Sequence, residues 1–117
     1  MGKLLQIRVS AWTYREEDVL STWPALARLA WPRPLYPGER RGVLELAGAL
    51  ENEILYADWD NRLREKLKAG VDEAAQLKMR LEAALADWAP REANRLSDLL
   101  EDALSELERN ASTLLNI

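Results

Sequence analysis

The sequence contains no cysteine and no histidine, and both absences exclude whole classes of chemistry. Without cysteine the chain forms no disulfide and offers neither a thiolate nucleophile nor a sulfur ligand for a metal. Without histidine it lacks the side chain that most often acts as a general base near neutral pH. A ferritin-like metal centre also needs a Glu-x-x-His motif, so that class of site is excluded as well.

Positive charge is in short supply, because 16 Lys and Arg residues stand against 20 Asp and Glu residues, for a net charge of -4. Nucleic acids and acidic membranes both reward surplus positive charge, so we expect neither as a partner. Long apolar runs are missing too, since Gln6 and Arg8 interrupt the apolar start of the chain. We therefore expect a cytoplasmic protein that does not enter a membrane.

Leu and Ala recur at helical spacing from Glu39 to Ile117. This pattern predicts a mainly α-helical fold in a single domain of 117 residues. Residues 39–117 are expected to form a helical bundle of about three longer helices. Residues 1–38 are expected to supply an extended or β-strand arm, a short helix and a Pro-rich connector.

The arm has a period of two, with Leu5, Ile7, Val9 and Ala11 on one face, as in a half-buried strand. A lone strand leaves its backbone groups unpaired, so it needs a partner. That partner is either the Pro-rich stretch 32–37 or the same strand in a second copy of the chain. The alternative is an arm that lies along the bundle without pairing.

Several residues mark the expected ends of helices. Thr13 and Glu16 have the spacing of a capping box and predict the start of the short helix. Pro24 predicts a break near residues 21–23, and Pro90 predicts the start of the last helix. Gly70 is expected to form a turn that ends one helix and begins the next. Between these points the apolar face moves by two residues after Ala57, which indicates a different neighbour for the second half.

The last helix has apolar positions spaced alternately four and three apart, as along a coiled-coil seam. These positions are Leu96, Leu100, Ala103, Leu107, Asn110, Leu114 and Ile117. The face packs either within the core of one chain or against a partner. Asn110 on this seam could fix its register, unless it is simply solvated.

Five of the eight aromatic residues lie in the first 36 positions: Trp12, Tyr14, Trp23, Trp31 and Tyr36. We call this set the aromatic N-terminal cap. Trp and Tyr combine a large apolar area with one polar group, so they suit core edges, interfaces and ligand sites alike. The cap is expected to cover the open end of the bundle, with a ligand pocket or a protein interface as the alternatives.

Acidic residues recur at helical spacing in three groups: Glu51 with Asp58, Glu53 with Asp60, and Asp98 with Glu101 and Asp102. The last group lies opposite the leucine seam and is interpreted as a solvated face. Glu53 and Asp60 lie close to Tyr56 and Trp59, where the apolar face shifts. They are the candidates for a divalent-metal site, although no catalytic residue and no cofactor are predicted.

The sequence favours a non-catalytic protein–protein interaction module, such as an adaptor, a small chaperone or an assembly subunit, and a homodimer or another protein complex. The candidate interface residues are Leu5, Ile7, Val9, Trp12, Trp31, Leu100, Leu107 and Leu114. One alternative is a metal-dependent enzyme or small-ligand binder that uses the carboxylates of residues 51–60. Another is a regulator that contacts nucleic acid through the basic residues between Arg62 and Lys68.

Overall fold

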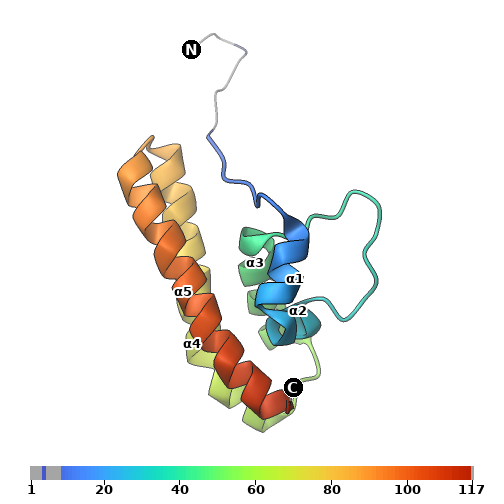
Figure 1. Cartoon of the computed structure of the whole chain (residues 1–117). Coiled ribbons are helices and arrows are strands. Elements are labelled where there is room, and N and C mark those ends of the chain that lie inside the picture. The colour runs from blue at the N-terminus through green and yellow to red at the C-terminus, as the bar shows by residue number, and fades with distance from the viewer. Residues whose placement is uncertain (1–3, 5–8, 117) are drawn as a thin grey trace.

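The computed structural model describes residue 4 and residues 9–116, and every regular element within them is a helix. This confirms the predicted mainly α-helical fold (Figure 1). The alternating residues Leu5 and Ile7 lie outside the described residues, so the predicted strand is not tested. The five helices are α1 (Glu16–Thr22), α2 (Pro24–Ala30), α3 (Val43–Tyr56), α4 (Asn61–Ala86) and α5 (Pro90–Leu115).

Helices α4 and α5 form a long antiparallel hairpin, and the three shorter helices pack on one side of it (Figure 1). Each hairpin helix has 26 residues, which corresponds to about 39 Å at 1.5 Å per residue. The closed end of the hairpin, near Trp88, extends beyond α3 in this view. None of the helices among the described residues is both long and apolar enough to cross a membrane.

One hydrophobic core connects the five helices, and leucine supplies most of it. The largest fully buried side chains are Leu26, Leu46, Leu50, Leu67, Val71, Leu96, Leu100, Leu104 and Leu107. On α5 the buried positions recur every three or four residues, as expected for a helix that packs along its whole length. The face of α5 predicted from the leucine spacing is therefore largely the face that this chain buries within itself. Asn110 is exposed and takes no part in the packing.

The turn predicted at Gly70 is wrong, because α4 runs without interruption through this residue. A Cβ at position 70 would lie 2.6 Å from Leu107 Cδ1. Gly70 therefore allows α5 to approach α4 closely, and Leu107 fills the space that a side chain would take. Packing between the helices outweighs the low helix propensity of glycine here.

The other predicted boundaries fit the structure. Helix α1 ends at Thr22 and α2 begins at Pro24, so the chain breaks at Trp23 as expected. Pro90 is the first residue of α5. The interruption between α3, which ends at Tyr56, and α4, which begins at Asn61, was not predicted, because the shift of the apolar face after Ala57 indicated only a different neighbour.

The capping box predicted for the first helix does not form, since α1 has no side-chain cap. Its two residues instead satisfy backbone amides next to α3. Thr13 Oγ1 accepts a hydrogen bond from the Val43 amide at 2.8 Å, and Glu16 Oε1 accepts one from the Arg41 amide at 2.6 Å. Gly42 permits this approach, because a Cβ there would lie 2.2 Å from Thr13 Oγ1. The segment before α1 is thereby fixed to the start of α3.

Side chains from distant elements also cap α2 and α3. Glu108 on α5 accepts hydrogen bonds from the amides of Ala25 at 3.1 Å and Leu26 at 2.9 Å, the first free donors of α2. Arg64 on α4 donates to the carbonyl oxygens of Ile54 and Ala57 at the end of α3. Helices α2 and α3 are thus each held to the hairpin by a charged side chain as well as by apolar contact.

Candidate functional site

The interface candidates on α5 divide between the core and its edge. Leu100 and Leu107 are 1% and 2% exposed. Leu114 is partly buried against the same core. A partner molecule therefore meets little of this leucine face in the folded chain. The structure assigns Leu100 and Leu107 to internal packing, which was the other use that the sequence left open for them.

The aromatic N-terminal cap is not a single cluster. Trp23 is 4% exposed, and its indole Nε1–H donates to Ser105 Oγ at 3.1 Å, so this ring belongs to the core. Trp31 is partly buried, with the Arg41 guanidinium 5.4 Å from its ring centre. By contrast, Trp12 is 67% exposed. Only part of the predicted cap covers the core.

The segment before α1 presents large side chains to solvent. Tyr14 is 95% exposed, and Val9 is also an exposed apolar residue. The Trp12 ring lies 3.8 Å from the Arg40 guanidinium, a cation–π contact that orients it. Between these two aromatic residues, Thr13 is hydrogen-bonded to the start of α3. Both rings are therefore exposed on a backbone that the fold holds in place.

A hollow of about 260 Å³ lies beside these two rings. We call it the arm groove. It lies between the segment before α1, the first turn of α3 and the middle of the hairpin. Its apolar lining residues are Ala11, Trp12, Val43, Leu44, Leu81 and Leu100. Trp12 and Leu100 both line the arm groove, so it joins two candidate interface residues that are far apart in the sequence.

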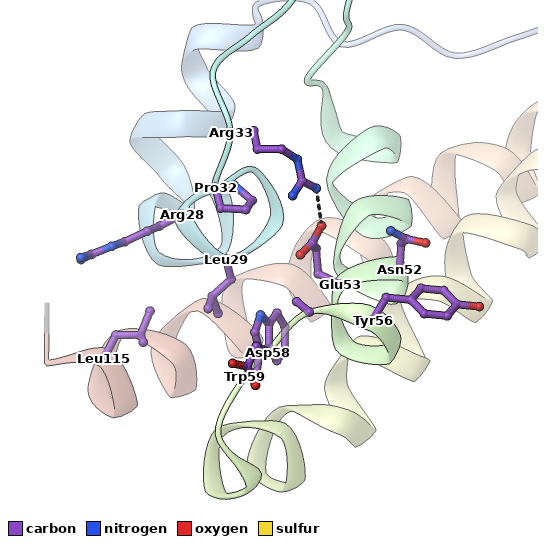
Figure 2. Close-up of a pocket in the computed structure, with 11 residues that line it drawn as sticks. Arg28, Leu29, Pro32, Arg33, Asn52, Glu53, Tyr56, Asp58, Trp59 and Leu115 are labelled. Atoms are coloured by element: carbon purple, nitrogen blue, oxygen red, sulfur yellow. Dashed lines mark hydrogen bonds and ion pairs between the residues drawn. The ribbon is translucent and has the colours of Figure 1, made fainter.

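A second and larger hollow, of about 620 Å³, surrounds Glu53 (Figure 2). We call it the Glu53 pocket. It lies between the end of α2, the connector that follows it, the end of α3 and the end of α5. Its lining includes Leu29, Pro32, Arg33, Asn52, Glu53, Tyr56, Asp58, Trp59 and Leu115. The sequence singled out Glu53, Tyr56 and Trp59 together, and the structure gathers these three around one opening.

Glu53 is the one buried charged residue in the described part of the chain, at 7% exposure. Its Oε1 accepts a hydrogen bond from Arg33 Nη2 at 3.1 Å, while the Arg33 side chain itself is 76% exposed. Arg33 belongs to the connector between α2 and α3. No spacing rule relates it to Glu53, so sequence reasoning missed this partner.

Asp60, the other metal candidate, has a structural role. It is the N-cap of α4, and its Oδ1 accepts a hydrogen bond from the Leu63 amide at 2.8 Å. Because α3 ends at Tyr56, neither Asp58 nor Asp60 shares a helix face with Glu51 or Glu53, contrary to the prediction from their spacing. Over residues 4 and 9–116, no group of three or more acidic side chains is close enough to hold a metal ion.

The basic residues that start α4 do not form a uniform surface. Arg62, Lys66 and Lys68 are exposed, whereas Arg64 is partly buried and is used to cap the end of α3. The arrangement of these basic residues therefore adds no support to the nucleic-acid hypothesis.

Ion pairs with arginine lower the pKa of two glutamates. A hydrogen bond from Arg41 holds the pKa of Glu39 below its ordinary value, and one from Arg95 does the same for Glu92. The Glu39–Arg41 pair lies in the connector between α2 and α3, which also contains Arg33 of the Glu53 pocket. Arg41 also donates to the Arg33 carbonyl at 2.8 Å, which helps to place Arg33 beside Glu53.

No protein-family model, no curated protein and no solved structure matches the chain. The two hollows and the side chains that line them are therefore the features of this chain that bear on its function.

Proposed function

We propose that the protein is a non-catalytic interaction module that pairs with a second copy of itself through the arm groove and the segment before α1. The observation that carries this proposal is the exposure of Trp12 and Tyr14, at 67% and 95%, on a backbone fixed to α3. Exposed Trp and Tyr are enriched where proteins bind one another, because they bury a large area at a small entropy cost.

The arrangement of the leucine face supports this location. Leu100 and Leu107 are used within the chain, so the interface lies where apolar side chains remain accessible. Among the residues that line the arm groove, Trp12 is exposed and Leu44 is only partly buried. A ring from a second copy that entered the groove would be removed from water against aliphatic side chains.

The sequence of the arm supports a second copy as the partner. The alternation of Leu5, Ile7 and Val9 is typical of a strand, and a strand must pair its backbone with another strand. Two copies related by a two-fold axis would each supply the strand that the other requires. We propose that this dimer is cytoplasmic, because a chain without cysteine is suited to a reducing compartment.

Light scattering coupled to size exclusion tests the proposal. The intact chain is expected to elute as a dimer, and a variant without residues 1–12 as a monomer. The double substitution Trp12→Ala with Tyr14→Ala keeps the whole arm and is expected to shift the equilibrium toward monomer at least tenfold, about 1.4 kcal/mol.

The matched control is Tyr36→Ala, which removes a ring of similar exposure, 65%, from the connector. It is expected to leave the dimer intact. A monomer at every concentration, or equal weakening by the control and the double variant, would contradict the proposal.

A further inference from the structure

We infer that the Glu53 pocket is a binding site for a small organic cation, an amine, amidine or guanidine that carries an apolar group. This site is separate from the arm groove and does not depend on self-association. Its volume of about 620 Å³ falls within the range of small-molecule sites, about 300–1,000 Å³.

The charges in the pocket favour a cation. Glu53 has a side chain that is only 10% exposed, and Asp58 adds a second carboxylate to the lining. Two arginines also line the pocket, but Figure 2 shows the Arg28 side chain pointing away from Glu53. The other arginine, Arg33, is paired with Glu53, so these two charges balance each other. The charge that remains in the lining is the carboxylate of Asp58, and a ligand that displaces Arg33 also meets the carboxylate of Glu53.

The rest of the lining suits the apolar part of such a ligand. Leu29, Trp59 and Leu115 are all partly buried residues of the core edge, and they line the pocket near Glu53. Figure 2 shows Leu29 and Trp59 below Glu53 in the view, and both residues line the pocket together with Asp58. An aromatic face also attracts a cation through its quadrupole. A flat amidinium could thus meet carboxylate at one end while its ring contacts Trp59.

Arg33 already shows how such a group is held. Its guanidinium bonds to Glu53, yet three quarters of the side chain is in solvent. It comes from the connector, where the chain forms no helix and Gly38 has a φ of +84°. Arg33 thus acts as an internal occupant that an external cation replaces. Replacing one charged hydrogen bond with another keeps the buried carboxylate paired throughout.

The probe is benzamidine, with benzoate as the anionic counterpart and benzyl alcohol as the neutral one. Titration of the wild-type chain, followed by ¹H–¹⁵N NMR, is expected to move the Trp59 indole resonance and the amides of Leu29 and Leu115. The Trp12 indole resonance is expected to stay in place. N-acetyl-arginine-N-methylamide, which represents an arginine side chain in a polypeptide, is titrated in parallel. Tighter binding of benzamidine would indicate a free amidine as the ligand, and tighter binding of the arginine derivative would indicate an arginine side chain. Either result supports a cation site.

Two substitutions test the roles of the ion pair. Glu53→Gln is expected to weaken benzamidine binding about tenfold or more, whereas Glu51→Gln, on the exposed side of α3, is expected to have no effect. Arg33→Ala is expected to tighten binding several-fold, because it removes the guanidinium that competes for Glu53. The fraction of molecules in which Glu53 can pair with the ligand then rises. Far-UV circular dichroism checks that each variant is folded.

An anionic ligand would give the opposite responses to these probes and substitutions. If the pocket bound an anion through Arg33, benzoate would move the Trp59 resonance and Arg33→Ala would abolish binding. That result, or unchanged Trp59 and Leu29 resonances in the wild type with millimolar benzamidine, would overturn the proposal. A failure here leaves the dimer proposal intact, because the oligomeric state is measured without any ligand.

Discussion

Alanine substitutions at Gly48 and Gly70 are expected to change the free energy of unfolding in opposite directions. Both glycines lie inside helices, Gly48 in α3 and Gly70 in α4. Helix propensity alone would stabilise both variants by up to about 1 kcal/mol. The difference arises from what each new methyl group would contact.

At Gly48 the added Cβ would meet the Lys78 side chain at 3.7 Å, an ordinary van der Waals distance. At Gly70 it would lie 2.6 Å from Leu107 Cδ1 and 3.6 Å from Leu107 Cγ. Leu107 is 2% exposed, so it has little room to move aside. Overpacking of this kind costs about 1–3 kcal/mol, which exceeds the gain in helix propensity.

We therefore expect Gly48→Ala to stabilise the protein by about 0.5–1 kcal/mol. Gly70→Ala is expected to destabilise it by about 1 kcal/mol, which is a mid-range overpacking cost of about 2 kcal/mol minus a propensity gain of about 1 kcal/mol. With an unfolding entropy of about 2.1 cal/mol/K per residue, 1 kcal/mol corresponds to a shift in Tm of roughly 4 °C in a chain of this length. Urea unfolding followed by circular dichroism at one protein concentration measures both changes.

A double variant isolates the cause. If the Leu107 contact is responsible, the cost of Gly70→Ala falls when Leu107 is replaced by Val, which removes the atoms that clash. Equal stabilisation by both glycine substitutions would refute the close approach of α5 to α4 at this point. So would a cost for Gly70→Ala that the Leu107→Val background leaves unchanged.

Further expectations concern the polar groups that join the helices. Glu108→Ala is expected to cost about 2 kcal/mol in urea unfolding, because it frees two amides at the start of α2, whereas Glu106→Ala on the exposed face is expected to cost under about 0.5 kcal/mol; equal costs would contradict the cap. Asp60→Ala is expected to cost about 1 kcal/mol and Asp60→Asn much less, since asparagine also caps helices. The pKa of Glu39, measured by NMR, is expected to rise toward its ordinary value in Arg41→Gln. Because the folded-state pKa is lowered, the stabilisation from this pair is present above about pH 4.5 and is lost as the pH falls through the folded-state pKa. An unchanged Glu39 pKa in that variant would exclude the ion pair as its cause.

The sequence predicted the features that depend on neighbours along the chain. The break at Trp23 and the start of α5 follow from Pro24 and Pro90, whose rings restrict the backbone locally. The apolar face shifts after Ala57, where α3 and α4 are interrupted. This shift indicated a different neighbour for the residues that follow, and the break itself was not predicted. Helical periodicity, which reflects burial of one face, identified most of the buried leucines.

The features that depend on distant residues were missed. Gly70 suggested a turn because propensity is a local property, while the contact with Leu107 joins residues of two different helices. Thr13 and Glu16 have the spacing of a local capping box, but they bond to amides near the start of α3. The pairing of Arg33 with Glu53 requires the connector to fold back onto α3.

Whether the protein forms a dimer is decided by the molar mass of the intact chain in solution. Sedimentation equilibrium over a range of concentrations measures this mass for the wild type and for the Trp12→Ala, Tyr14→Ala variant. We expect the wild type to approach twice the 13.3 kDa mass of the chain reversibly, and the dissociation constant to be at least about tenfold higher in the variant. A wild type that stays at 13.3 kDa throughout, or a dimer that the two substitutions leave unchanged, would contradict this expectation.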